Sequence, residues 1–426
     1  MDTQMELLYS NFLKSRGVSI DTRTINKGDL FFGISGENFN GSSYANQALK
    51  RGASFAVIDD PEYVADERTL LVEDSLTALQ ELAKLHRSKF QGKVLAITGS
   101  NGKTTTKELV REVLSQKYRV RATQGNYNNH LGVPLTILQL TEQTEIAIIE
   151  MGANHLGEIA GLCEIAQPHL GLITTIGQAH TEGFGGIEGV LRGKSELFDY
   201  LKKSDGLPFI NVQDNRLHHM AKRFENSVTF PAGDLKLSPS DEVLKLSIKD
   251  LKVTTQMTGE YNFTNASAAV AVGRFFNIDD EKIAEALEAY KPENQRSQII
   301  KRGTNTIILD AYNANPDSMG AALKNLSTFD GKKVAILGQM NELSNSRGTH
   351  REFGKEVARM NFDEVILVGE KIEPALEFLP NAKHFNSTNL LKAYLTEHSF
   401  QYSVILLKAS RSIGLEEVVE KLYPWT

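Results

Sequence analysis

The stretch Ile97-Thr98-Gly99-Ser100-Asn101-Gly102-Lys103-Thr104 decides the fold of this chain. It continues an apolar run of strand length at 93–98 and leads into a helical pattern over 104–117. A strand, a loop ending in Gly-Lys-Thr and a helix form the setting that a phosphate-binding loop requires. Glycines let backbone N–H groups approach a phosphate, and the helix N-terminus adds a favourable dipole. Lys103 can then reach the β- and γ-phosphates of a nucleotide, and the Thr104 hydroxyl can bind Mg²⁺.

The loop departs from the commonest phosphate-loop pattern, because Ile97 stands where the first glycine is usual. A plain glycine turn at the start of a helix is the alternative. The strand before the loop and the helix after it favour phosphate binding.

Outward from this loop, strand and helix patterns alternate along the chain. Apolar runs of strand length lie at 54–58, 93–98, 145–150, 170–176, 306–310, 333–338, 363–369 and 402–407. Helical patterns lie at 104–117, 187–203, 261–276, 316–326 and 349–360. The alternation predicts an α/β protein whose parallel sheets are covered on both faces. Residues 228–256 are the exception, because Leu244, Leu246 and Ile248 alternate with polar residues and predict an antiparallel patch attached to the central sheet.

Length and composition limit the classes of protein to consider. A chain of 426 residues predicts two to four domains, and the strand–helix pattern restarts near residues 90 and 300. We therefore expect domains at 1–90, 91–299 and 300–426. No apolar run approaches the roughly 20 residues that span a bilayer, and Met1 to Arg16 lacks the apolar core of a signal peptide.

Charge and cysteine content limit the classes of binding partner and the cell compartment that we expect. The net charge is −6 and no basic run stands out, which argues against nucleic acid or a membrane surface as the main partner. The single cysteine, Cys163, excludes an internal disulfide and is typical of a reducing cytosol. Its apolar neighbours indicate a buried thiol rather than a nucleophile.

Two polar residues follow successive strands. Glu150 ends the run 146–150, and His180 comes shortly after the run 170–176. Ligands of an open parallel sheet collect beyond the carboxyl ends of its strands. We therefore expect Glu150 and His180 beside the phosphate loop, where they would hold a metal ion. Taken singly, a surface acid and a loop histidine are the alternative.

Lys194 stands in the apolar stripe of a predicted helix. It lies seven residues after Ile187, among Val190, Leu191 and Leu197. Desolvation would lower its pKa and leave a neutral amine that can take up CO₂ as a carbamate, a new anion for a metal. The alternative is a lysine that extends along its stem to solvent.

Several segments together resemble the Mur ligases over nearly the whole chain, and within them the MurF family. They are Asn126-Tyr-Asn-Asn-His-Leu-Gly-Val-Pro134, Glu150-Met-Gly-Ala-Asn154, His180-Thr-Glu-Gly-Phe-Gly185, Tyr261-Asn-Phe-Thr-Asn-Ala266 and Asp310-Ala-Tyr-Asn-Ala-Asn-Pro316. The chain lacks the Asp-Asn-Pro-Arg motif of the sibling that adds a diamino acid. It also differs from folate-polyglutamate synthetases, which typically show an Asp-Gly-Ala-His-Asn-Pro type segment near Asp310 to Pro316.

The resemblance implies three domains: an N-terminal α/β substrate domain, a central phosphate-loop ATPase domain and a C-terminal Rossmann-like domain. It implies ATP-dependent ligation of D-Ala-D-Ala to UDP-MurNAc-tripeptide through an acyl phosphate, with Mg²⁺, in the cytoplasm and as a monomer. A noncatalytic nucleotide switch is the competing hypothesis. The metal cluster predicted beside Lys103 argues against it.

The resemblance also implies roles for individual residues. The catalytic set is Lys103, His180 and Lys194; the metal set is Thr104, Glu150, His180 and Lys194 as a carbamate. The ATP set is Thr98, Gly99, Ser100, Asn101, Gly102, Lys103, Thr104, Asn262 near adenine, Arg296 at the phosphates and Asp310 near the ribose. The substrate set is Asp21, Thr22, Arg23, Asn40 and Gly41 for the UDP moiety, Asn128 and Asn129 for the growing peptide, and Asn313 and Asn315 for the dipeptide.

Some of these residues have a purely structural alternative. The Asp21–Arg23 pair can be a solvated ion pair in a turn, and Asn262 can cap a helix. Asn313 and Asn315 before Pro316 can be turn residues. The chain also departs from the family pattern at Gln339, where Asp is frequent, and at Ser344 and Ala409, where Gly is usual.

Overall fold

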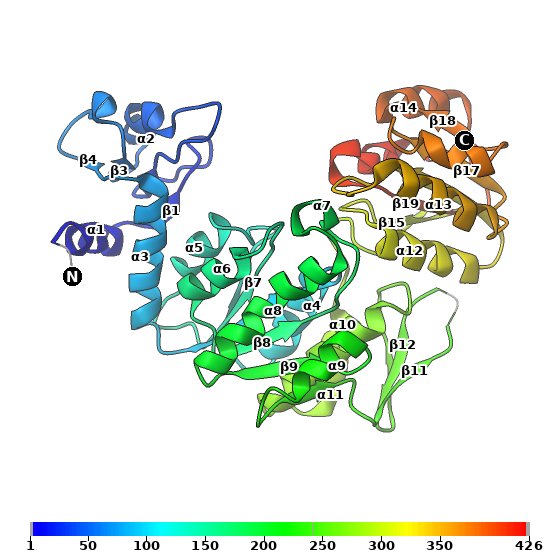
Figure 1. Cartoon of the computed structure of the whole chain (residues 1–426), viewed down its shortest axis with the longest axis horizontal. Coiled ribbons are helices and arrows are strands. Elements are labelled where there is room, and N and C mark those ends of the chain that lie inside the picture. The colour runs from blue at the N-terminus through cyan, green and yellow to red at the C-terminus, as the bar shows by residue number, and fades with distance from the viewer. Residues whose placement is uncertain (1–2, 241, 423–426) are drawn as a thin grey trace.

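The computed structural model describes residues 3–240 and 242–422, which form three α/β bodies in chain order. Figure 1 shows the N-terminal body and the C-terminal body on opposite sides of the central one. The predicted α/β class and the parallel sheets are confirmed. No helix in the described ranges is long and apolar enough to cross a bilayer.

The N-terminal body is a small parallel sheet in the order β1-β2-β3-β4. Its strands are β1 (Val18–Ser19), β2 (Leu30–Phe32), β3 (Phe55–Ile58) and β4 (Thr69–Leu71); its helices are α1 (Thr3–Lys14), η1 (Gly41–Tyr44), α2 (Ala45–Lys50), η2 (Pro61–Tyr63) and α3 (Ser75–Lys89). Leu79 and Leu82 of α3 belong to the same hydrophobic core as Val133 and Leu162 of the central body. That shared core joins the first two bodies.

The central body is a parallel sheet in the order β10-β9-β8-β5-β7-β6. Its strands are β5 (Lys93–Thr98), β6 (Val120–Ala122), β7 (Ile146–Glu150), β8 (Leu170–Ile173), β9 (Leu207–Asn211) and β10 (Val228–Phe230). Its helices are α4 (Lys103–Ser115), α5 (Gly132–Ile137), α6 (Glu158–Ala166), α7 (Thr181–Phe184), α8 (Ile187–Lys203), α9 (Asn215–Ala221), α10 (Asn262–Phe275) and α11 (Asp280–Ala289). Two separate cores lie against this sheet, because its strands are apolar on both faces.

Strand β5 sits where the strand order reverses. The chain moves from β5 to β6 and β7 on one side and then to β8 on the other. The crevice at the carboxyl ends of β5, β7 and β8 is where open α/β sheets bind ligands. The phosphate loop leaves β5 at this crevice.

The predicted antiparallel patch is a separate three-stranded sheet rather than part of the central one. Its strands are β11 (Leu235–Ser238), β12 (Lys245–Ile248) and β13 (Leu251–Thr254). Leu244, Leu246 and Ile248 are buried, as the alternation predicts. The start of the predicted patch is wrong, because Val228 to Phe230 pair in parallel with β9 at the edge of the central sheet.

The C-terminal body is a six-stranded sheet in the order β14-β15-β19-β16-β17-β18. Its strands are β14 (Gln298–Arg302), β15 (Asn305–Leu309), β16 (Lys332–Gly338), β17 (Glu364–Val368), β18 (Lys383–Phe385) and β19 (Ser403–Lys408). Its helices are α12 (Pro316–Thr328), α13 (Ser346–Ala358), η3 (Glu373–Phe378), α14 (Thr388–Glu397), η4 (Arg411–Ile413) and η5 (Leu415–Lys421). Two strands of this sheet, β14 and β18, are absent from the predicted strands, and β14 runs antiparallel to β15.

Candidate active site

A cavity of about 900 Å³ lies where the central body meets the C-terminal body. The phosphate loop contributes Ser100 to Thr104, and strand ends and loops contribute Asn128, Asn129, Glu150 and His180. Residues Arg296, Asp310, Asn313, Asn315 and Lys408 line it from the following segment of the chain. The cavity therefore gathers most of the predicted ATP, metal and peptide residues.

The phosphate loop requires glycine at two positions. Gly99 has φ +142° and Gly102 has φ +80°. A Cβ on Gly99 would lie 2.0 Å from Thr174 Oγ1, and one on Gly102 would lie 2.3 Å from Asn265 Oδ1. A side chain at either position would displace the loop from the helix start.

Lys103 curls over this loop. Its Nζ donates to the carbonyl oxygens of Gly99 at 2.7 Å and Ser100 at 3.3 Å. Burial lowers the pKa of Lys103, while the negative charge of Glu150 opposes that shift. The ammonium is thus held at the mouth of the loop. Thr98, by contrast, is buried behind it and donates to Met151 O.

Glu150 combines with Thr104 and Asn128 beneath the loop. Its Oε1 accepts from Thr104 Oγ1 at 3.1 Å and from Asn128 Nδ2 at 2.7 Å. Its Oε2 is buried without a hydrogen bond from any described residue, and Lys107 Nζ lies 3.8 Å away. A buried carboxylate oxygen with free acceptor capacity beside a hydroxyl suits a hard cation such as Mg²⁺.

His180 lines the same cavity but faces the C-terminal body. It has φ +56°, and its Nδ1 lies 2.6 Å from Glu342 Oε2. The hydrogen bond with His180 lowers the pKa of Glu342. Within the described ranges, no group of three or more His, Cys, Asp or Glu side chains is arranged to hold a metal. Thr104 and Glu150 are thus in direct contact, whereas His180 is paired with Glu342.

Lys194 is fully buried in α8, with 0% exposure. Its Nζ donates to Ala153 O at 3.0 Å and lies 5.0 Å from the centre of the Phe184 ring. Burial, reinforced by the positive charge of Lys103, lowers its pKa well below the ordinary value. The alternative in which Lys194 extends to solvent is wrong.

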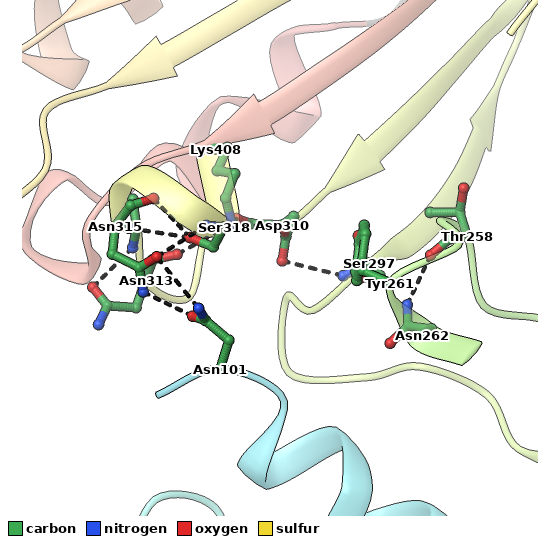
Figure 2. Close-up of polar contacts among 11 residues, drawn as sticks. Asn101, Thr258, Tyr261, Asn262, Ser297, Asp310, Asn313, Asn315, Ser318 and Lys408 are labelled. Carbon is green, nitrogen blue, oxygen red and sulfur yellow. Dashed lines mark hydrogen bonds and ion pairs between the residues drawn. The ribbon is translucent and has the colours of Figure 1, made fainter. Parts of the chain in front are cut away.

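Three more of the predicted ATP residues, Asn262, Arg296 and Asp310, also line the cavity. Asn262 is the first residue of α10 and does not cap it; its Nδ2 donates to Thr258 O at 2.7 Å (Figure 2). The Arg296 guanidinium lies 3.8 Å from the centre of the Tyr312 ring. Asp310 accepts from Lys408 Nζ at 2.6 Å.

Asn313 and Asn315 both make local hydrogen bonds, and Asn315 also makes a longer-range one. Asn313 Oδ1 accepts from Ala314 N, and Asn315 caps α12 in a capping box with Ser318. Asn315 Nδ2 also donates to Asn101 Oδ1 at 2.7 Å, which ties the C-terminal body to the phosphate loop (Figure 2). Asn129 similarly caps its own turn, accepting from Leu131 N and Gly132 N.

The predicted UDP-binding residues lie apart from this cavity in the N-terminal body. Arg23 pairs with Asp21 in a turn, its side chain is 84% exposed, and its hydrogen bonds hold the pKa of Asp21 at about 2. Thr22 Oγ1 donates to Gln47 Oε1. Asn40 caps η1 and donates to Asp60 Oδ2 at 2.8 Å. Gly41 packs against Ile34, where a Cβ would lie 2.2 Å from the carbonyl oxygen.

Sequence reasoning missed four residues of the cavity region: Lys107, Asp317, Glu342 and Lys408. Asp317 accepts from Gln178 N at 2.7 Å, and Glu342 pairs with His180, so both are contacts between bodies. Such contacts leave no trace in local periodicity. Lys107 does have a sequence signal, since it lies one helical turn after Lys103 on the buried side of α4.

Comparison with known proteins places these features in a family. Residues 14–87 match the model "Mur ligase family, catalytic domain", 97–273 match "Mur ligase middle domain", and 295–411 match "Mur ligase, glutamate ligase domain". The UDP-N-acetylmuramoyl-tripeptide–D-alanyl-D-alanine ligase of Bacillus subtilis is 36% identical, covering 95% of this chain and 93% of that protein. Its counterpart from Escherichia coli is 33% identical, covering 95% and 93%.

Solved structures agree with these matches. Crystal structure I of MurF from Acinetobacter baumannii has a TM-score of 0.87 at 30% identity, covering 98% of both chains. MurF ligase from Thermotoga maritima in complex with ADP has a TM-score of 0.82 at 27% identity, covering 99% of this chain and 98% of that one. The chain therefore belongs to the Mur ligase family, and within it to the UDP-N-acetylmuramoyl-tripeptide–D-alanyl-D-alanine ligases.

Proposed function

We propose that this chain ligates D-alanyl-D-alanine to UDP-N-acetylmuramoyl-tripeptide at the expense of ATP, giving the UDP-linked pentapeptide precursor of peptidoglycan. The observation that carries the proposal is one cavity in which the phosphate loop meets Asn313 and Asn315. An enzyme that activates a carboxylate with ATP and then passes it to an amine needs such a shared space. The full-length relatives named for this reaction support the same substrates.

The reaction runs through two displacements. The terminal carboxylate of the tripeptide attacks the γ-phosphorus of ATP, so that its oxygen gains the phosphoryl group as an acyl phosphate while the bond to ADP breaks and ADP leaves. The free amine of D-Ala-D-Ala then attacks the acyl carbon, and phosphate leaves from the tetrahedral intermediate. Lys103 stabilises charge on the transferring phosphoryl group, because its ammonium stands at the loop mouth. Closure of the C-terminal body, through contacts such as Asn101–Asn315, would exclude water from the acyl phosphate.

We assign Mg²⁺ to Thr104 and Glu150. The buried Oε2 of Glu150, which accepts no hydrogen bond from the described residues, supports this assignment. When bound, Mg²⁺ would neutralise phosphate charge. His180 would bind this ion only if its contact with Glu342 were replaced by a bond to the metal.

We further propose that Lys194 carries a carbamate. Its amine would attack CO₂, forming an N–C bond and losing one proton to solvent. Burial supports the neutral amine that this step needs, because it disfavours the ammonium form. The carbamate would add an anion on the Ala153 side of the cavity.

We assign the UDP moiety to residues 1–90 and ATP to 91–299. We assign the dipeptide to 300–426, which also closes over ATP and places Asp310 at its ribose. We place the reaction in the cytoplasm and the working form as a monomer. The lone cysteine, buried and free, is compatible with a reducing compartment.

Phosphate release tests the proposed function directly. We expect phosphate to form from ATP only when UDP-MurNAc-tripeptide and D-Ala-D-Ala are both present, with the pentapeptide seen by mass spectrometry. Comparing lysine- and diaminopimelate-containing tripeptides would identify the natural acceptor. Steady phosphate release without either substrate, and no pentapeptide, would contradict ligation.

Arg23→Ala should separate the two substrates. Arg23 is exposed in a turn of the N-terminal body, away from the cavity residues assigned to the dipeptide. We expect the KM for the UDP-linked substrate to rise about ten- to a hundredfold, since one charge-assisted contact is worth roughly 1.5–3 kcal/mol. The KM for D-Ala-D-Ala should stay within about twofold. Arg68→Ala is the matched control, because Arg68 forms a similar exposed turn pair with Asp66. An equal rise for both substrates would contradict the assignment of the N-terminal body.

A further inference from the structure

Lys408 is a buried lysine at the end of β19, where the strand reaches the cavity. Its side chain is 3% exposed. The Nζ atom lies within hydrogen-bond distance of three oxygens: Asp310 Oδ2 at 2.6 Å, Asn313 O at 3.3 Å and Asp310 O at 3.4 Å. An ammonium has three donors, so these acceptors use all of them. Lys408 therefore has no donor left for a substrate.

Asp310 is held from two sides. Lys408 binds its Oδ2, and the backbone N–H of Ser297 donates to its Oδ1 at 3.3 Å. Ser297 Oγ in turn lies 2.7 Å from Tyr261 OH, next to α10. Figure 2 shows Lys408, Asp310, Ser297 and Tyr261 following one another from the C-terminal sheet to the central body. The Asp310 side chain keeps 15% exposure and lines the cavity.

This arrangement fixes the direction in which a carboxylate is presented. A carboxylate with both oxygens anchored cannot turn freely about its last torsion, and its remaining lone pairs point to one part of the cavity. A nucleotide hydroxyl is a suitable donor to those lone pairs.

We propose that Lys408 is a positioning residue: by orienting Asp310 it sets how strictly the nucleotide site selects for ribose hydroxyls. The inference rests on the proposed function in that it takes Asp310 as the ribose-binding acid. It goes beyond that function by giving the selectivity to a lysine that touches no substrate. The two side chains should then act as one unit.

Calorimetric binding of ADP and 2′,3′-dideoxy-ADP tests this without any ligation step. We expect the unaltered chain to bind ADP at least about tenfold more tightly, the worth of one hydrogen bond to a charged group. In Lys408→Met and in Asp310→Asn the preference should fall to about twofold. The double variant should match Asp310→Asn alone, because residues acting as a unit are not additive.

Lys383→Met is the matched control. Lys383 forms a lysine–carboxylate pair with Glu364 at 2.8 Å between β18 and β17 of the same sheet, and neither residue lines the cavity. The Lys383→Met variant should therefore keep the full preference for ADP over 2′,3′-dideoxy-ADP. Should the lone carboxylate prevent Lys408→Met from folding, the double variant removes both charges and is compared with Asp310→Asn.

Three results would overturn the inference. The first is equal binding of both nucleotides by the unaltered chain. The second is a full preference for ADP in Lys408→Met. The third is a further loss of preference in the double variant relative to Asp310→Asn, because it would mean that Lys408 contacts the nucleotide itself. Since nucleotide binding is measured alone, a failed ligation assay would leave these outcomes readable.

Discussion

Lys103→Ala is expected to reduce the rate of ligation by about 10²- to 10³-fold, the usual cost of removing one preorganised donor from a developing charge. The ammonium stands at the loop mouth, donating to Gly99 O and Ser100 O, so the substitution removes a point charge from the phosphates. The fold should persist for two reasons. The Lys103 side chain is only half-buried, so its removal leaves no hole in a core. The burial that it does have lowers its pKa, which means that the folded state disfavours its charge. Thermal unfolding at an unchanged temperature, together with lost phosphate release, would bear this out.

The matched control for Lys103 is Lys117→Ala. Lys117 lies just past the other end of α4, is exposed, and donates to Asn277 O. It should leave the ligation rate within about twofold. Normal turnover in a folded Lys103→Ala protein would show that the phosphate loop does not contribute to the reaction as proposed.

The parts of the fold that follow from local pattern could be predicted from the sequence. The run 93–98 and the helix 187–203 lie where the periodicity predicts them, as β5 and α8. The reason is that a buried parallel strand must be apolar on both faces and an amphipathic helix must repeat about every 3.6 residues. Burial of Lys194 follows from the same stripe.

Most of the strands that the sequence does not predict are short or lie at a sheet edge, although β9 (Leu207–Asn211) is internal. Gln298–Arg302 and Asn305–Leu309 are separated by Gly303 and Thr304, with Gly303 at φ +55°, which is a hairpin signal. The first strand contains Lys301 and Arg302 and is only half-buried, so its apolar content is weak. Val228–Phe230 is only three residues long and pairs on one side only, in parallel with β9. An edge strand carries little pattern of its own, and its partner is set by tertiary structure.

Local pattern predicts the site only within one body, and the predicted residues from the C-terminal body depend on the family resemblance. The phosphate loop and Glu150 are the clearest case, since both lie at neighbouring strand ends of one sheet. The pairing of His180 with Glu342 and of Asn101 with Asn315 joins residues that are 162 and 214 positions apart. The relative placement of two bodies decides those contacts, and no local spacing encodes it.

Lys194→Ala and Lys194→Met should both lose ligation, by about 10²- to 10³-fold if the carbamate supplies a preorganised charge. They should differ in stability and in chemical rescue. Methionine fills the space of the lysine stem and removes a buried amine, so it should not lower the unfolding temperature. Alanine leaves a hole beside Phe184 and Ala153 and should lower it.

Short carboxylates then distinguish a modified lysine from a merely buried one. Formate or acetate should enter the hole of Lys194→Ala and restore part of the ligation rate, because they replace the missing anion next to the cavity. They should have no effect on Lys194→Met, where the methionine side chain occupies the same space. A new carbamate signal in ¹³C spectra of the unaltered chain with labelled bicarbonate should be absent from both variants. A buried, unmodified Lys194 would instead give no carbamate signal and no rescue, since its Nζ would serve only to bind Ala153 O and to pack against Phe184.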